Sequence, residues 1–269
     1  MNVPNFGPGT DPGVLRAWAG TIEGLGYGLL MVSDHVAVTA DVASQYPAPF
    51  YEPFTTLSWL AGMTTRVRLG TTVLILPYRH PLLVARMAAN LNDLSGGRLV
   101  LGVGVGWARD EFAALGVPFH RRGALTDSAL TAVRAAWADA SDYRSGEVPI
   151  WVGGNSDAAI RRAARFGDAW HPLRFTMDWL RSAVRSRALP GLAPRIALRL
   201  TEAPISGGPR LAGEGTVAQI VADLTALAHL GASTVVLDPF NGDPRETCHP
   251  ETAWHALATV AAAYRRTLV

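Results

Sequence analysis

The chain has 269 residues, of which 49% are hydrophobic and 17% charged, so it is long enough for one large core. The net charge is only +2, and because no basic run would follow a nucleic-acid backbone, we expect no nucleic-acid partner. The single cysteine, Cys248, excludes an internal disulfide framework. The N-terminus lacks a signal-peptide pattern and the apolar runs are too short to cross a bilayer, so we expect no membrane association and a cytoplasmic location.

In the first half of the chain, β-rich runs alternate with helical patterns. A helix is predicted at 11–26, because Asp11 suits the N-cap, Pro12 the first helical position and Gly26 the end. The next helix is predicted to end at the pair Gly96–Gly97, where left-handed backbone is accessible. The elements expected here after the first helix are a strand at 28–35, a helix at 52–64, a strand at 66–76 and a helix at 80–97.

The second half continues this alternation. Strands are predicted at 98–106, 149–154, 168–172, 195–202 and 233–239. Helices are predicted at 126–140, 156–167, 176–189, 215–231 and 251–266. The helix at 215–231 begins with a capping box formed by Thr216 and Gln219.

Strands that are apolar on both faces and separated by helices predict a parallel sheet covered by helices, which is an α/β fold. With "MNVPNF" at the N-terminus counted as a shortened first strand, roughly eight strand–helix units are present, the number that closes a (β/α)8 TIM-like barrel. Because no linker composition interrupts the chain, we predict a single domain over residues 1–269.

Glycines alternate along the strand at 98–106. Gly102, Gly104 and Gly106 are expected to lie on one face of it. A dinucleotide-binding fingerprint is disfavoured, because its glycine spacing differs and it belongs in the first strand–helix unit. Two interpretations stay open: the glycines leave a flat opening at the carboxyl end of a barrel strand, or they relieve crowding inside the barrel.

Four stretches carry a family resemblance: "MVSDHV", residues 51–123 with "GVGVGWARDEF", "PIWVGGNSDAAIRRAARFGDAWHP" and residues 215–238. Together they resemble the bacterial luciferase-like superfamily, and most of all its branch that depends on the deazaflavin coenzyme F420. The resemblance implies a TIM-like barrel that binds F420, or alternatively FMN, at the carboxyl ends of its strands. It also implies a small-molecule substrate and a homodimer.

The resemblance implies roles for several residues of this chain. Asp34 and His35 match an acid–histidine pair that faces the cofactor ring, where His35 would orient or protonate and Asp34 would orient His35. A satisfied core histidine is the alternative for His35. Thr72 and Val73 match a position where relatives hold a non-proline cis peptide under the ring. The remaining cofactor residues implied are Gly104, Gly106, Trp107, Gly153, Gly154 and Asn155.

The segment "WVGGNSD" is the expected phosphate end of the cofactor site, because Gly153 and Gly154 let backbone N–H groups approach an anion and Asn155 or Ser156 caps the next helix. A plain strand–helix turn is the alternative. His171, Trp170 and Arg79 are expected to line the substrate pocket. The other histidines show no ligand spacing, so we predict no metal site.

The chain departs from the family in three places. The first strand is short, and the segment at 138–148, after the fourth helix of the barrel, is shorter than usual. These departures predict a more open pocket, or one completed by a partner subunit. Trp107 stands where the glucose-6-phosphate dehydrogenase branch has a glutamate, so sugar-phosphate chemistry is disfavoured.

The leading functional hypothesis is therefore an F420-dependent oxidoreductase that transfers hydride to or from a C=C, C=N or carbonyl/alcohol group of a small substrate. The alternatives are an FMN-dependent luciferase-like monooxygenase, supplied by a separate cofactor reductase, and a flavin-binding protein without turnover.

Overall fold

The computed structural model describes residues 1–138, 148–185 and 189–267. The shortened segment expected at 138–148 therefore lies almost entirely outside the described residues. The helices are α1 (Pro12–Gly24), α2 (Ala40–Ala43), α3 (Pro53–Ala61), α4 (Pro81–Leu94), α5 (Arg109–Ala114), α6 (Arg122–Ala138), α7 (Asp157–Phe166), α8 (Met177–Arg185), α9 (Val217–His229) and α10 (Pro250–Arg265). The strands are β1 (Asn2–Val3), β2 (Leu29–Val32), β3 (Arg68–Thr71), β4 (Leu74–Ile75), β5 (Leu99–Gly104), β6 (Ile150–Gly153), β7 (Ala169–His171), β8 (Arg195–Ala197), β9 (Arg199–Leu200), β10 (Glu214–Gly215) and β11 (Val236–Asp238).

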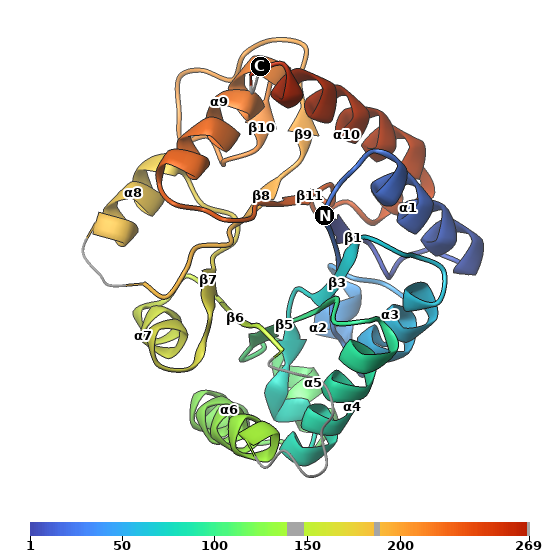
Figure 1. Ribbon diagram of the computed structural model, residues 1–269, viewed down its shortest axis with the longest axis vertical. Coiled ribbons are helices and arrows are strands. Elements are labelled where there is room, and N and C mark those ends of the chain that lie inside the picture. Colours follow the sequence, from blue (N-terminus) through green and yellow to red (C-terminus); the bar gives the residue numbers. More distant parts are fainter. Residues whose placement is uncertain (139–147, 186–188, 268–269) are drawn as a thin grey trace.

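The main sheet is parallel. Its hydrogen-bonded order is β1-β2-β3-β5-β6-β7, with β4 paired to β5. Single bridges, such as Leu173 with Arg195, join the β7 region to β8, and β8 pairs with β11 in parallel. β1 lies next to β11, where the Asn2 amide donates to Asp238 Oδ1 at 3.0 Å. The strands thus surround a common centre, with the helices outside them (Figure 1).

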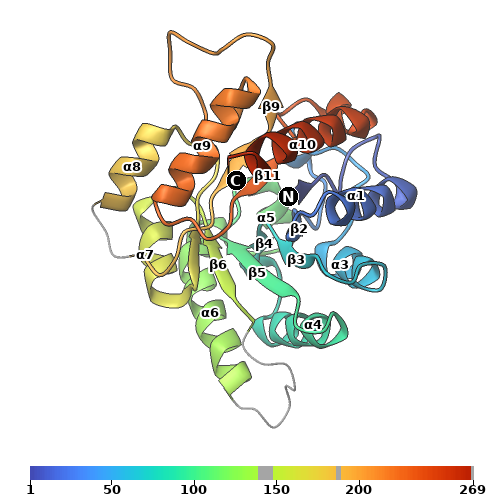
Figure 2. The ribbon, with the colours of Figure 1, turned by 45° about the horizontal axis from the view of Figure 1, so that its top comes forward.

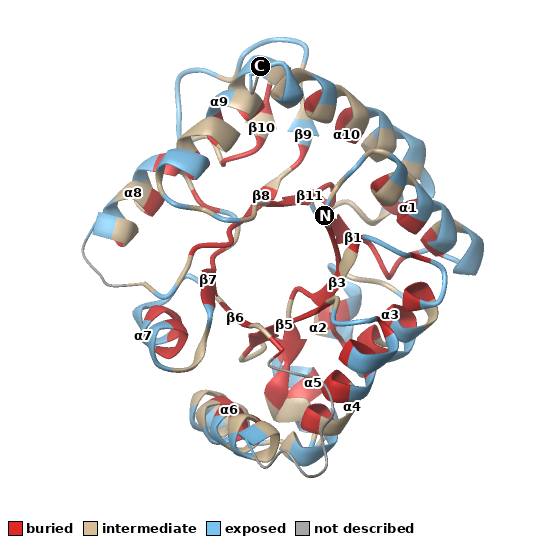
Figure 3. Ribbon diagram, viewed as in Figure 1, coloured by how far each residue is buried: buried red, intermediate tan, exposed pale blue. Residues whose placement is uncertain are grey.

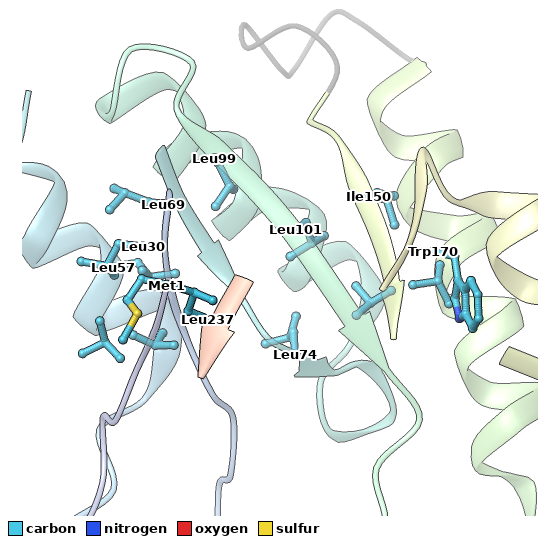
Figure 4. Packing of buried hydrophobic residues seen from close by; sticks show 14 of the residues in the cluster. Met1, Leu30, Leu57, Leu69, Leu74, Leu99, Leu101, Ile150, Trp170 and Leu237 are labelled. Atoms are coloured by element: carbon cyan, nitrogen blue, oxygen red, sulfur yellow. The ribbon is translucent and has the colours of Figure 1, made fainter. Parts of the chain in front are cut away.

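Two apolar layers hold these elements together. The larger one lies between strands and helices and includes Leu101, Ile150 and Trp170 on the strands (Figure 4). A smaller cluster that includes Met31 and Trp151 faces the interior of the ring. Because both faces of the strands are buried, their sequences are apolar runs without alternation, as predicted (Figure 3). Each fully buried large side chain stabilises the fold by about 2 kcal/mol.

The helix boundaries predicted from capping residues are confirmed, whereas the helix predicted from residue 126 begins earlier, at Arg122. The Asp11 carboxylate accepts the Val14 N–H at 2.8 Å at the start of α1. The Thr216/Gln219 capping box is formed at the start of α9, which lies beside α10 in both ribbon views (Figure 2). Gly96 and Gly97 after α4 have φ of 70° and 81°.

Three local expectations need correction. The strand predicted at 66–76 divides into β3 and β4 at the Thr72–Val73 peptide bond, which is cis. Gly106 does not share a strand face with Gly102 and Gly104, because β5 ends at Gly104 and Gly106 has a φ of 77° in the following turn. The short helices α2 and α5 were not predicted, because neither shows a sustained apolar period.

Candidate active site

The carboxyl ends of neighbouring strands bring the central predicted residues together. Asp34 and His35 follow β2, Thr72 follows β3, and Trp107 follows β5. Since parallel strands end at the same edge of the sheet, these residues lie at one end of it although they are far apart in sequence. The rings of His35 and Trp107 are in contact there. Asp34, His35 and Thr72 are buried, while Trp107 is 42% exposed.

His35 is held by a glutamate that the sequence analysis did not assign. Its Nδ1 lies 2.6 Å from Oε2 of Glu111, in α5, and the side chain of Glu111 is fully buried. The same carboxylate accepts the backbone N–H groups of Val36 at 2.6 Å and Ala37 at 3.1 Å, and the Tyr78 hydroxyl at 2.9 Å. Because an ionised Glu111 only accepts, Nδ1 of His35 carries a hydrogen and Nε2 is left for a further partner.

The surroundings of Glu111 favour the charged form of its carboxylate. Burial acts to raise the pKa of Glu111, but the His35 ring and the amides of Val36 and Ala37 outweigh it, so the pKa lies below its ordinary value. Burial, followed by the charge of Glu111, raises the pKa of Tyr78, which therefore stays a neutral donor. Glu111 is thus a fixed acceptor that orients the imidazole.

Asp34 does not orient His35 as expected. Its carboxylate accepts both terminal nitrogens of Arg79, at 2.7 and 2.9 Å, and the backbone N–H of Ile75 at 2.8 Å. Arg79 also contacts Glu52 at 3.1 Å. Burial acts to lower the pKa of Arg79. The hydrogen bonds to Asp34 and the charges of Asp34 and Glu52 outweigh burial, so the pKa of Arg79 is raised. In this bidentate geometry the Asp34 carboxylate and the Arg79 guanidinium bond to each other. Asp34 therefore fixes the position of the segment that follows β4.

An aromatic cluster covers His35. Its ring stacks on Tyr46 at 5.5 Å between centroids, meets Phe50 edge-on at 5.3 Å and meets Trp107 edge-on at 5.7 Å. Phe6 contacts Tyr46 and Phe50 in turn. This cluster limits the water around His35 and leaves the indole of Trp107 as its exposed edge.

Glycines of β5 and β6 make room for the Thr71–Val73 segment. A Cβ on Gly102 would lie 2.0 Å from the Thr71 carbonyl oxygen. A Cβ on Gly104 or Gly153 would lie 2.4 or 2.8 Å from methyl groups of Val73. The relief of crowding, one of the two interpretations left open above, therefore accounts for Gly102 and Gly104 directly. Val73 itself stays partly exposed at the strand ends.

A series of buried, hydrogen-bonded polar side chains crosses the interior beneath this segment. Arg195, from β8, donates to the Thr72 carbonyl at 3.0 Å, and Asp238 of β11 accepts its Nε at 2.8 Å. The Thr72 hydroxyl lies 2.9 Å from Nε2 of His171, whose Nδ1 bonds the Ala193 carbonyl. Burial lowers the pKa of His171 to about 4, so its ring is neutral at pH 7.

The expected phosphate end is an exposed strand–helix turn. Ser156, not Asn155, caps α7, because its hydroxyl accepts the Ala159 N–H at 3.2 Å. Asn155 instead bonds both backbone groups of Leu173, at 2.6 and 3.0 Å. Gly154 has a φ of 115°, a conformation that L side chains rarely adopt.

Trp170 does not reach the group around His35. Successive residues of β7 face opposite sides, so His171 points into the interior while Trp170 packs among the outer helices (Figure 4). Its indole N–H donates to the Gly154 carbonyl at 2.8 Å, and its ring lies 5.8 Å from that of Trp179. Trp170 is fully buried and belongs to the core, so the expectation of a pocket role is not supported.

Glu111 and Arg195 are buried polar residues of this region that the sequence analysis did not assign. Glu111 lies 76 positions from His35, and Arg195 lies 123 positions from Thr72. One available signal for Glu111 was its place in a short polar stretch directly after a glycine-rich strand. Among the described residues, no group of three or more His, Cys, Asp or Glu side chains could hold a metal ion. In the same part of the chain, no helix combines the length and apolarity needed to span a bilayer.

A family model described as "Luciferase-like monooxygenase" matches residues 4–188. The chain belongs to this family. An uncharacterized protein of Mycobacterium tuberculosis is 35% identical over 178 residues, which are 55% of this chain and 61% of that protein. The phthiodiolone/phenolphthiodiolone dimycocerosates ketoreductase of the same species is 29% identical over 225 residues, 74% of this chain and 58% of the enzyme. The match therefore spans about three fifths of the length of these relatives.

Solved structures share the fold. The monooxygenase RslO1 from Streptomyces bottropensis superposes with a TM-score of 0.76 at 17% identity, over 100% of this chain and 99% of that one. An F420-dependent secondary alcohol dehydrogenase, in complex with an F420–acetone adduct, gives a TM-score of 0.68 at 14% identity, over 93% and 96%. The oxygenating constituent of 3,6-diketocamphane monooxygenase from Pseudomonas putida, in complex with FMN, gives 0.69 at 13% identity, over 97% and 95%. At these identities the likeness establishes the fold.

Proposed function

We propose that the protein is an F420-dependent oxidoreductase that transfers hydride to or from a small organic substrate. The observation that carries the proposal is the His35–Glu111 pair at 2.6 Å, buried at the strand ends beside the exposed indole of Trp107. A histidine with a fixed Nδ1 partner offers Nε2 as a proton donor or acceptor. Among the described residues, no bond to Nε2 of His35 is found.

The residues at the strand ends suit a flat cofactor ring. Val73, Val105 and Gly106 are partly exposed there, and Trp107 stands beside them. Such a surface packs against a planar aromatic system. We assign Thr72, Val73, Gly104, Gly106 and Trp107 to the ring of the cofactor. Gly153, Gly154 and Asn155, at the N-terminus of α7, are assigned to its phosphate end.

The bound deazaflavin would supply hydride chemistry, and the protein would supply position and a proton. For a ketone substrate, hydride adds to the carbonyl carbon, the C=O π bond breaks, and the oxygen takes a proton, giving an alcohol. His35 is the residue proposed to hold that proton, and Glu111 orients it. Arg79 and Asp34, each paired with the other, position the segment after β4 rather than contact the substrate.

We further infer a single domain over residues 1–269, in which the strands close as an eight-unit barrel through contacts between β11 and β1. A cytoplasmic homodimer acting on a small molecule is the proposed setting. An FMN-dependent monooxygenase, served by a separate cofactor reductase, is the second candidate, and the description of the matched family favours it.

Titration of the purified protein with F420 and with FMN, each followed by fluorescence, separates the two candidates. We expect saturable F420 binding. Tight FMN binding with no measurable affinity for F420 would overturn the proposal in favour of the second candidate.

Replacement of His35 tests the proton role. We expect His35→Ala to lower turnover by roughly 10²–10⁴-fold while cofactor affinity stays within a few-fold of wild type. Glu111→Gln should retain binding and shift the pH profile of kcat, because a neutral amide no longer fixes the His35 tautomer. His229→Ala, at an exposed position of α9, is the control. Unchanged turnover in His35→Ala would remove His35 from the mechanism.

A further inference from the structure

A small cavity beside β8 and β11 has arginines at both its buried and its exposed end. Its volume is about 50 Å³, which holds a small polar group, whereas sites for whole small molecules have roughly 300–1,000 Å³. The buried end is formed by the pair of Arg195 and Asp238, and the exposed end carries Arg174 and Arg199. We call it the arginine cavity. No residue assigned above to the cofactor lines it.

The backbone of Arg174 is held in a conformation that a side chain disfavours. Its φ is 46°, and among the described residues every other φ in this positive range belongs to a glycine. Asn155 bonds both backbone groups of the preceding Leu173, and the Arg174 guanidinium donates to the Phe240 carbonyl at 3.2 Å. These contacts fix the loop after β7 against the loop after β11, with an arginine where a glycine would be unstrained. Backbone strain of this kind is typical of functional positions.

The two exposed arginines have hydrogen-bond donors to spare. A guanidinium carries five N–H groups. Within the described ranges, the side chain of Arg174 bonds only to the Phe240 carbonyl, and that of Arg199 only to Glu214, at 3.4 Å. The Arg199 and Glu214 side chains are 56% and 17% exposed, so this pair is weak. Most donors at the exposed end are therefore available to a ligand.

The acceptors of the cavity, by contrast, are occupied. Oδ2 of Asp238 accepts Arg195, and Oδ1 accepts the Asn2 amide at 3.0 Å and the Phe240 N–H at 3.2 Å. Glu214 accepts Arg199. Among the described residues that line the cavity, three guanidiniums face two carboxylates. The surplus of positive charge and of donors favours a negatively charged ligand that accepts hydrogen bonds.

We propose that the arginine cavity binds an oxyanion, a carboxylate or phosphate group, through the guanidiniums of Arg174 and Arg199. Arginine suits this ligand because its N–H groups form a planar fork that matches two oxygens of a carboxylate or phosphate. The site is separate from the phosphate end assigned to Gly153, Gly154 and Asn155, and it does not depend on which cofactor binds. The oxyanion belongs either to the substrate or to a free small anion.

Calorimetric titration of the purified protein with inorganic phosphate tests the site. Arg174→Gly should weaken phosphate binding at least tenfold, because it removes a charged donor. The same variant should melt at the wild-type temperature or above it, because glycine adopts a φ of 46° without strain. Phosphate affinity equal to that of the wild type would overturn the inference.

Two further variants should change phosphate affinity in opposite directions. Arg199→Gln should weaken binding, whereas Glu214→Gln should tighten it, because it removes the carboxylate that competes for Arg199. Arg266→Gln, at the exposed position directly after α10, is the matched control for the loss of one positive charge. Changes of the same sign in Arg199→Gln and Glu214→Gln, or an equal loss in Arg266→Gln, would contradict the assignment.

Turnover of two matched ketones identifies the source of the oxyanion. 4-Oxopentanoate and 2-pentanone have the same chain length and differ in one carboxylate. If the substrate carries the oxyanion, the wild type should favour 4-oxopentanoate at least tenfold in kcat/KM, and Arg174→Gly should lose that preference. Equal kcat/KM values together with Arg174-dependent phosphate binding would identify a free anion.

The failure of this inference is distinguishable from the failure of the proposed function. Phosphate binding that depends on Arg174 in a protein that binds no F420 would support the arginine cavity and refute the proposed function. Normal F420 binding with a phosphate affinity that is the same in Arg174→Gly as in the wild type would do the reverse.

Discussion

At the scale of single residues, the burial of His171 should make stability depend on acid. Its pKa is lowered to about 4 from an ordinary 6.5, first of all by burial. Between these two values the unfolded chain binds a proton that the folded protein excludes. Folding stability is therefore fully present above pH 6.5 and is lost as the pH falls toward 4.

Denaturant unfolding at several pH values measures this effect. The wild type should lose about 3 kcal/mol of unfolding free energy through this group between pH 7 and 4. His171→Gln should show a shallower slope over that range. His229→Gln, at an exposed site, should keep the wild-type slope. Parallel pH curves for wild type and His171→Gln would contradict the assigned burial effect.

At the scale of elements, the same substitution should have opposite effects in a strand and in a helix. A Cβ on Gly102 in β5 would lie 2.0 Å from a backbone oxygen, which cannot move aside. Gly102→Ala should therefore cost about 3 kcal/mol or more. Gly20, in the middle of α1, has no neighbour within 4 Å of its ideal Cβ. Gly20→Ala should stabilise by about 0.5–1 kcal/mol. Thermal melting of both variants distinguishes them, and equal shifts would refute the crowding around β5.

The elements were predictable wherever a local apolar pattern dictates them. The order of strands and long helices follows from alternating apolar runs and from caps such as Asp11 and Thr216. The site was only partly predictable, since its contacts join distant segments. The partner of His35 is Glu111, 76 residues away, and the partner of Asp34 is Arg79. No local spacing encodes such pairings, because the strand ring alone brings these segments together.

At the scale of the whole molecule, one ion pair ties the last strands to the first half of the chain. Arg195 and Asp238 are 9% and 4% exposed, and Arg195 reaches the Thr72 carbonyl across the interior. Asp238→Ala leaves a buried guanidinium without its carboxylate and should cost about 3–5 kcal/mol.

Chemical denaturation checks this cost. Arg245→Ala, which breaks an exposed pair with Asp243, should leave the midpoint unchanged within error. The double variant Arg195→Met/Asp238→Ala should recover part of the loss, because no unpaired charge remains. A midpoint for Asp238→Ala equal to that of Arg245→Ala would mean that the Arg195–Asp238 pair does not stabilise the fold.

The exposed indole beside His35 gives the protein an optical reporter of its own. Trp107 is 42% exposed and its ring centre lies 5.7 Å from that of the imidazole. A coloured ring stacked beside this indole would absorb its emission. The difference in emission between wild type and Trp107→Phe thus isolates a signal that follows ligand arrival without any added label.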